Sequence, residues 1–214
     1  MATNRPSEKA FRFLPKVLII PTLSFFDKVS ILFVNLHIHP NTLTYFGFAA
    51  GFGVGLFYFL ERPFWAMVLI FLCGVFDILD GKVAVNANRK SIFGAILDSS
   101  FDRYTEFFMY VGLAYHFRTH WTLWLTFAAF LGSTMVSYTR ARAEGLGVDC
   151  RVGIMQRAER LVLLFAGTAI GLAFKIFDPA MTAVLAFIAL ASNVTAVQRL
   201  AYVRRYEKRK TGGR

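Results

Sequence analysis

The stretch CGVFDILDGKVAVNANRKSIFGAILDSSFDRYTEF, residues 73–107, decides how this chain folds, because it sets acidic residues within otherwise apolar sequence. Asp77 and Asp80 are three positions apart, and Asp98 and Asp102 are four apart. Each pair therefore shares one face of a helix. Gly94 continues the second face one turn earlier, where a missing side chain lets a ligand or another helix approach. The spacing predicts two adjacent helices whose facing ends carry four carboxylates.

The composition around this stretch is that of a membrane protein. The chain has 214 residues, of which 56% are hydrophobic and only 17% charged. A soluble domain of this length usually carries more charge. The apolar residues come in blocks of about twenty, the length that crosses a bilayer as a helix. We therefore expect an all-α membrane protein with six transmembrane helices, at residues 40–60, 63–83, 93–116, 121–142, 157–176 and 179–201.

The N-terminal region differs from these blocks. Residues 11–36 are apolar but contain Pro15, Pro21 and Asp27, which favours an amphipathic helix lying in the membrane interface over one that spans. We divide the chain into an N-terminal cytoplasmic or interfacial segment, residues 1–36, a six-helix membrane domain, residues 37–203, and a basic cytoplasmic tail, residues 204–214. The end of the tail, KRKTGGR, is expected to be disordered.

The net charge of +11 comes from basic residues that lie between and beyond the apolar blocks. Anionic lipid headgroups and phosphate-bearing substrates are therefore expected partners, rather than nucleic acid. Three of the connections between blocks carry only Arg62, Arg118 and Lys175 as basic residues, and the others are far richer. By the positive-inside rule, both termini and the acidic cluster face the cytoplasm.

Four carboxylates in a setting of low dielectric constant must be protonated, paired with cations or gathered around metal ions. Oxygen ligands without His or Cys suit Mg²⁺ or Mn²⁺ rather than zinc. Four carboxylates are enough for two such ions, and two-metal sites suit phosphoryl chemistry because they can hold a diphosphate. The competing interpretation is a set of solvated or structural acids, which the paired spacing with adjacent glycines disfavours. Arg103 and Glu106 are interpreted as a structural pair.

These residues resemble the signature of the CDP-alcohol phosphotransferase family, D-x-x-D-G-x-x-A-R-x8-G-x3-D-x3-D. The matching residues are Asp77, Asp80, Gly81, Ala84, Gly94, Asp98 and Asp102. The segment HPNTLTYFG, residues 39–47, also resembles the entry to the first span in this family. One position departs, because the family Arg after Ala84 is Val85 here. The resemblance implies that this Arg lies near the nucleotide or its phosphates. Either activity is impaired, or another base such as Arg89 or Lys82 takes its place.

The resemblance implies a metal-dependent transferase of phospholipid synthesis, with residues 37–203 as its catalytic domain. Its donor would be a CDP-linked lipid, usually CDP-diacylglycerol, its acceptor a small alcohol, and its by-product CMP. Asp77, Asp80 and Asp98 would hold divalent metal against the diphosphate. Asp102 would also contact the metal and act as general base on the acceptor hydroxyl. The residues implied at the nucleotide are Asn41, Asp80, Gly81, Ala84 and Gly94.

A second block, SYTRARAEGLGVDCRVGIMQRAERLVL, residues 137–163, gathers arginines at one cytoplasmic mouth. Clustered arginines suit a phosphate or another dianion, although the positive-inside rule alone also enriches such loops. The block is similar to that of the bacterial phosphatidylinositol-phosphate synthases, which have S-Y-x-K-A-R-A-E and a later E-R-x-E-R-L. This resemblance implies a pocket for the acceptor phosphate, formed by Arg140, Arg160 and Arg199. Arg140 replaces a Lys of that pattern and Gln156 replaces a Glu, so the match is partial.

We therefore expect an enzyme whose acceptor is inositol phosphate, with glycerol 3-phosphate as the rival. It would lie in a bacterial-type inner or plasma membrane, and a homodimer is considered because family members are often dimers. A cation transporter is the alternative from another class, but a basic cluster opening to the acidic side would repel cations. A scaffold without catalysis is favoured only by Val85.

Overall fold

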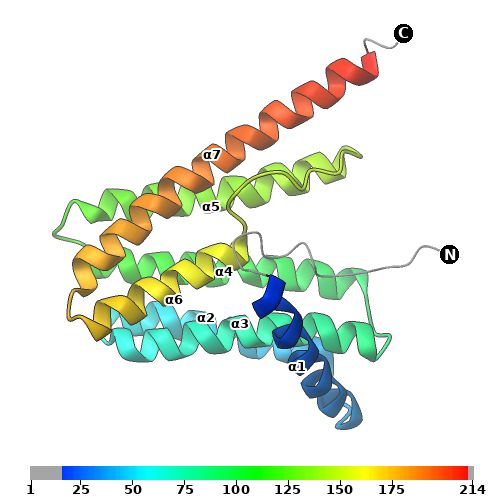
Figure 1. The fold of residues 1–214 in the computed structure, drawn as a ribbon, viewed down its shortest axis with the longest axis horizontal. Coiled ribbons are helices and arrows are strands. Elements are labelled where there is room, and N and C mark those ends of the chain that lie inside the picture. Colours follow the sequence, from blue (N-terminus) through cyan, green and yellow to red (C-terminus); the bar gives the residue numbers. More distant parts are fainter. Residues whose placement is uncertain (1–15, 212–214) are drawn as a thin grey trace. The chain divides into compact units, whose positions relative to one another are not determined.

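The computed structural model describes residues 16–211, and within them the chain forms seven α-helices and no strand (Figure 1). The predicted all-α class is confirmed. The helices are α1 Lys16–Asn35, α2 Pro40–Phe59, α3 Pro63–Asn86, α4 Ile92–His116, α5 Thr122–Gly145, α6 Arg157–Ala173 and α7 Phe177–Thr211. Helices α1 to α4 belong to one compact unit and helices α5 to α7 to a second.

Each of the six predicted spans coincides with one helix, from α2 to α7. Prolines begin two of them: Pro40 starts α2 and Pro63 starts α3. Proline is suited to the first helical position, where its missing N–H would have no partner in the helix. Two of these helices, Pro40–Phe59 and Phe177–Lys210, are long and apolar enough by length and composition to cross a membrane. Six crossings therefore remain a prediction.

In the first unit, α3 and α4 both pack against α2. The α2 and α4 backbones approach closely at a pair of glycines. A Cβ atom added to Gly112 would lie 2.1 Å from the Gly55 carbonyl oxygen, and one added to Gly55 would lie 2.2 Å from that of Phe108. Small residues allow such contact between membrane-type helices. This packing places the acidic part of α4 in the same unit as that of α3.

Helix α1 packs against α3 through apolar and polar contacts. Phe26, Val29 and Phe33 of α1 lie against the buried Leu79 and Val83 of α3. Polar contacts join the same two helices: Lys82 pairs with Asp27, and the Asn86 amide donates to the Ser30 hydroxyl over 2.7 Å. Among residues 24–35, Phe25, Ile31 and Leu32 are exposed apolar side chains on another face of α1. A helix is confirmed over residues 16–35, whereas its place in the membrane interface stays a prediction, and residues 1–15 lie outside the described part.

In the second unit, α7 packs against both α5 and α6. The loop between α5 and α6, residues 146–156, is tied to α7. The Thr195 hydroxyl accepts hydrogen bonds from the backbone N–H groups of Ile154 and Met155, over 3.2 and 3.1 Å. Gly153 in this loop has φ +118°, and an added Cβ would lie 2.2 Å from the Thr195 methyl carbon. Glycine is therefore required there, by backbone conformation and by space.

The C-terminal end corrects one expectation. Helix α7 continues through Thr211, as its red end in Figure 1 shows, so the expected disorder is wrong for Lys208 to Thr211. Arg, Lys and Glu are strong helix formers, and no Gly or Pro lies between Pro179 and Gly212. The last three residues lie outside the described part.

Candidate functional site

Three of the four predicted metal ligands come together in the first unit. Asp77 of α3 and Asp98 and Asp102 of α4 each offer a carboxylate oxygen, and these oxygens lie within 4.8 Å of one another. All three residues are partly buried. The spacing of four between Asp98 and Asp102 puts both on one face of α4, and helix packing brings that face to Asp77.

The fourth predicted ligand, Asp80, has a different partner. Its carboxylate accepts a hydrogen bond from the Thr44 hydroxyl of α2 over 2.8 Å, and the residue is buried. It lies close enough to Asp98 and Asp77 for the like charges to repel. Among the described residues, Asp80 therefore lies beside the three-carboxylate group and is not one of its members. Thr44 was not singled out from the sequence, where it is one of many hydroxyl residues.

The three carboxylates fit a hard divalent cation. Their donor set is entirely oxygen, which suits Mg²⁺, Mn²⁺ or Ca²⁺ rather than zinc. Carboxylates this close repel one another unless a proton or cation lies between them. One ion can be held by Asp77, Asp98 and Asp102, and a second would need Asp80 as well.

A pocket of about 240 Å³ lies next to these carboxylates and is bounded by α2, α3, α4 and the turn between α3 and α4. Asp98 belongs both to its wall and to the carboxylate group. The residues implied at the nucleotide all line it: Asn41, Asp80, Gly81, Ala84 and Gly94. The other lining residues are Pro40, Thr44, Arg89, Lys90, Ser91 and Ala95. Residues distant in sequence thus form one cavity beside the candidate metal site.

Two glycines of the pocket differ in the space that surrounds them. A Cβ atom added to Gly94 would lie 2.9 Å from the Ser91 hydroxyl and 3.2 Å from the Asn41 side-chain oxygen, so neighbouring protein atoms fill that space. The Ser91 hydroxyl accepts from the Gly94 N–H over 2.9 Å at the start of α4. A Cβ added to Gly81 would meet nothing within 4 Å. At Gly81 the protein's own packing does not require a glycine.

Three further residues from the sequence analysis lie on α3 and α4: Val85, which departs from the family signature, and Arg103 and Glu106, the predicted structural pair. Val85 is 41% exposed and is not a lining residue of this pocket. Arg103 donates to the Ser99 carbonyl one turn earlier on α4. Glu106 is buried, and its pairing with Arg103 stays a prediction.

In the second unit, the three arginines implied at an acceptor phosphate come from three helices. Arg199 of α7 lies close enough to Arg140 of α5 and Arg160 of α6 for their like charges to repel. Arg160 and Arg199 are buried, with 1% and 3% of their surface exposed. The Glu144 carboxylate offsets part of this repulsion, and a bound dianion such as phosphate would offset more of it.

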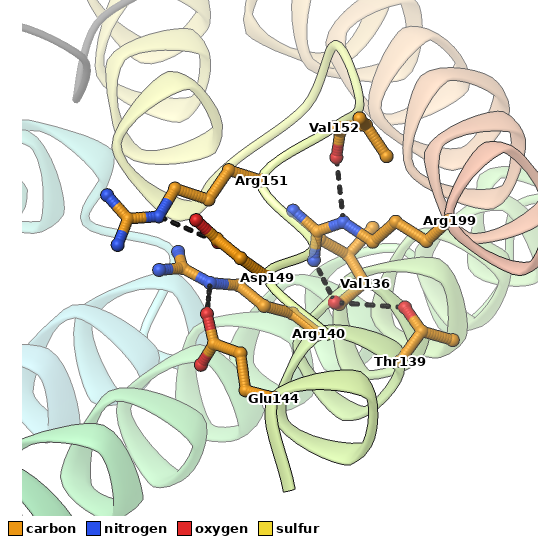
Figure 2. Close-up of polar contacts among 8 residues, drawn as sticks. All are labelled: Val136, Thr139, Arg140, Glu144, Asp149, Arg151, Val152 and Arg199. Atoms are coloured by element: carbon orange, nitrogen blue, oxygen red, sulfur yellow. Dashed lines mark hydrogen bonds and ion pairs between the residues drawn. The ribbon is translucent and has the colours of Figure 1, made fainter. Parts of the chain in front are cut away.

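Figure 2 shows how two of these arginines are held. Arg199 donates from Nε to the Val152 carbonyl over 2.9 Å and from a second nitrogen to the Val136 carbonyl. Arg140 donates from Nε to the Glu144 carboxylate over 2.9 Å, in an exposed pair on α5. The backbone role of Arg199 has no signal in the sequence, because it depends on how α5, α7 and the loop pack.

Cys150 lies within the loop of residues 146–156 and is buried. It packs with Ala143 and Val148, next to Val152 and Val203. Burial raises the pKa of the Cys150 thiol, because the thiolate loses hydration, and the positive charge of Arg199 only partly offsets this. The thiol is therefore a structural group and a reporter of the loop's closure.

Comparison with known proteins extends these observations. A model of the CDP-alcohol phosphatidyltransferase family matches residues 37–197. The chain is 38% identical over 136 residues to an archaetidylinositol phosphate synthase from Methanothermobacter thermautotrophicus, covering 63% of this chain and 67% of the relative. It is 34% identical over 170 residues to a phosphatidylinositol phosphate synthase from Mycobacteroides abscessus, covering 77% of each.

A solved structure is similar over most of the chain. The crystal structure of Mycobacterium tuberculosis phosphatidylinositol phosphate synthase with CDP-DAG bound has a TM-score of 0.75 and 27% identity, covering 82% of this chain and 92% of that one. A crystal structure of the same enzyme with manganese and citrate has a TM-score of 0.73 and 26% identity, covering 82% of this chain and 87% of that one.

Proposed function

The chain belongs to the CDP-alcohol phosphatidyltransferase family, and we propose that it transfers a phosphatidyl group from CDP-diacylglycerol to inositol phosphate, releasing CMP. One observation carries this proposal. The three-carboxylate group adjoins a pocket whose wall contains every residue implied at the nucleotide. A CDP-linked lipid needs both parts, since its diphosphate is anionic and its cytidine needs a cavity.

Asp77, Asp98 and Asp102 would hold a divalent ion in this scheme, with Mg²⁺ favoured and Mn²⁺ as a second candidate. When bound, the ion supplies positive charge against the donor's diphosphate. The manganese in the mycobacterial structure supports a metal of this class. A second ion is proposed to use Asp80, the carboxylate that lies beside this group.

Asp102 is the proposed general base. Its carboxylate would take the proton of the acceptor hydroxyl as that oxygen attacks the lipid-side phosphorus. A new oxygen–phosphorus bond forms, the bond to the CMP oxygen breaks, and CMP leaves. The pocket lined by Asn41, Gly81 and Ala84 would hold the cytidine end and fix the phosphorus in place.

Arg140, Arg160 and Arg199 are proposed to bind the phosphate of the acceptor. Their like charges within one unit favour a dianion over a neutral alcohol such as serine or inositol. Glycerol 3-phosphate carries the same charge. Inositol phosphate is favoured because the relatives named above are inositol phosphate lipid synthases. Arg199 would contribute charge while its backbone contacts hold the loop.

The remaining elements complete the proposal. Helices α2 to α7 would cross the membrane, α1 would lie in the interface, and both termini would face the cytoplasm of a bacterial-type inner or plasma membrane. A homodimer is proposed because members of the family are often dimers. Exposed apolar side chains on every helix support contact with lipid, among them Phe46, Trp65, Phe107, Trp124, Ile170 and Leu190.

The test is CMP release by the protein purified in detergent with CDP-diacylglycerol and Mg²⁺. Inositol 1-phosphate, glycerol 3-phosphate, inositol and serine are compared as acceptors. We expect turnover with inositol 1-phosphate that falls about a hundredfold or more in Asp102→Asn, which loses the base. Chelation should abolish turnover, and Mg²⁺ or Mn²⁺ should restore it. Asp178→Asn, the same change in the first turn of α7, is the matched control and should retain activity.

The outcomes separate the parts of the proposal. Turnover with glycerol 3-phosphate alone would keep the chemistry and discard the acceptor. CMP release by Asp102→Asn at the full rate would remove that residue as the base. No CMP release with any acceptor would contradict the transferase and favour a transporter or a scaffold.

A further inference from the structure

The family signature has an arginine immediately after Ala84, where this chain has Val85. A valine offers no charge and no hydrogen-bond donor. Two nearby bases could replace the missing arginine, Lys82 and Arg89. The structure distinguishes between them.

Lys82 is committed elsewhere. Its ammonium pairs with Asp27 of α1, and Lys82 is not a lining residue of the pocket. Arg89 lines the pocket together with Gly81 and Ala84. Among residues 16–211, no ion pair or hydrogen bond is recorded for the Arg89 guanidinium, so its donors are available to a ligand.

The end of α3 explains how Arg89 reaches the missing position. Asn88 adopts the left-handed conformation with φ 51°, and the chain turns back on the helix. The Arg89 N–H then donates to the Ala84 carbonyl over 2.9 Å, and the Asn88 N–H donates to the Val85 carbonyl over 3.1 Å. This pair of bonds is the Schellman motif. It brings residue 89 back beside the position where the family has its arginine.

The charges of the pocket call for such a base. Asp80 and Asp98 lie in its wall and carry negative charge that only bound metal ions would offset, whereas Arg89 and Lys90 line the pocket at the turn between α3 and α4. A guanidinium presents its donors in a planar fork that matches two phosphate oxygens. Resting on the function proposed above, we propose that Arg89 substitutes for the missing family arginine and binds the phosphates of the CDP-linked donor.

The test is equilibrium binding of CDP, in the presence of Mg²⁺, to the full-length protein in detergent. Arg89→Ala should weaken CDP binding about tenfold, because a charge-assisted hydrogen bond to phosphate is lost. The CDP affinity of Arg89→Lys should lie between those of the wild type and Arg89→Ala, since lysine keeps the positive charge and lacks the planar fork of donors. Arg62→Ala is the matched control, because it removes the same charge at the opposite end of α3 and should bind CDP as the wild type does.

Two further variants test the geometry. Val85→Arg in the Arg89→Ala background should recover most of the lost CDP affinity. Asn88→Val, which disfavours the left-handed turn while leaving Arg89 in place, should weaken CDP binding, whereas Asn88→Gly should not. Wild-type affinity in Arg89→Ala would overturn the role of Arg89 and leave the transferase intact. Absence of CDP binding by the wild type would overturn both.

Discussion

Gly81, a residue of the pocket wall, has open space where a side chain would lie. A Cβ atom placed there meets no protein atom within 4 Å, although the residue lines the pocket. Gly74 lies two turns earlier on the same helix and does not line this pocket. A Cβ added to Gly74 also meets no protein atom within 4 Å. The two glycines therefore form a matched pair for substitution.

Gly81→Ala should stabilise the fold and weaken nucleotide binding. Alanine favours an interior helix position by up to about 1 kcal/mol over glycine, while the new methyl group occupies space that the nucleotide needs. Thermal unfolding and CDP binding measure the two effects. Gly74→Ala should give the stabilisation alone, and an equal loss of CDP affinity in both variants would show that the pocket does not hold the nucleotide.

The loop of residues 146–156 is the clearest feature at the scale of elements. It is held to α7 by the Thr195 hydroxyl and by Arg199 on the Val152 carbonyl. The same loop leads into α6, where Gln156 and Glu159 form a reciprocal cap just before Arg160. Anchoring of the loop therefore fixes the start of the helix that carries a proposed phosphate ligand.

Thr195→Val should release this loop and expose Cys150. Loss of two hydrogen bonds of about 1 kcal/mol each would raise the open population about thirtyfold. We expect faster alkylation of Cys150, measured in a Cys73→Ala background. Burial raises the pKa of this thiol, so the thiolate forms as pH rises through that raised value, and the gain from opening should be largest at neutral pH.

Thr126→Val is the control for this experiment, because the Thr126 hydroxyl bonds only within its own helix, to the Thr122 carbonyl over 3.0 Å. Its labelling rate should match that of the Cys73→Ala parent. Equal rates in the Thr195 and Thr126 variants would mean that the loop is held by other contacts.

The length of α7 bears on the whole molecule. Its 35 residues amount to roughly 50 Å of helix, whereas the hydrocarbon core of a bilayer is about 30 Å thick. The part beyond Arg199 carries the basic residues Arg204, Arg205, Lys208, Arg209 and Lys210. These residues suit the anionic lipid headgroups of a membrane surface, which the proposed topology places on the cytoplasmic side.

Reporter fusions test the resulting topology. A fluorescent protein fused after residue 214 or within the loop at Gly147 should be bright in the cytoplasm. Alkaline phosphatase fused after Arg118 should be active on the outer side, because that connection has few basic residues. Phosphatase activity after residue 214 would contradict cytoplasmic placement of the C-terminus, and inactivity after Arg118 would contradict the six-span arrangement.

The positions of the helices and much of the candidate site could be predicted from the sequence. Helical periodicity is local, so spacings of three and four residues identify shared faces, and blocks of apolar residues identify the spans. Of the four carboxylates that the spacing predicted to converge, Asp77, Asp98 and Asp102 lie together and Asp80 lies beside them, and the residues implied at the nucleotide line one pocket. The end of α7 was misjudged because a charged tail resembles a disordered one even when most of its residues favour a helix.

The hydrogen-bond partners of the polar side chains could be seen only in the tertiary structure. Asp80 accepts from Thr44, 36 residues away, and Arg199 donates to backbone carbonyls of α5 and the loop. Arg89 reaches the pocket through the left-handed turn at Asn88. A hydrogen bond acts over about 3 Å, so its partner depends on helix packing and turn geometry, which residue spacing along one helix does not encode.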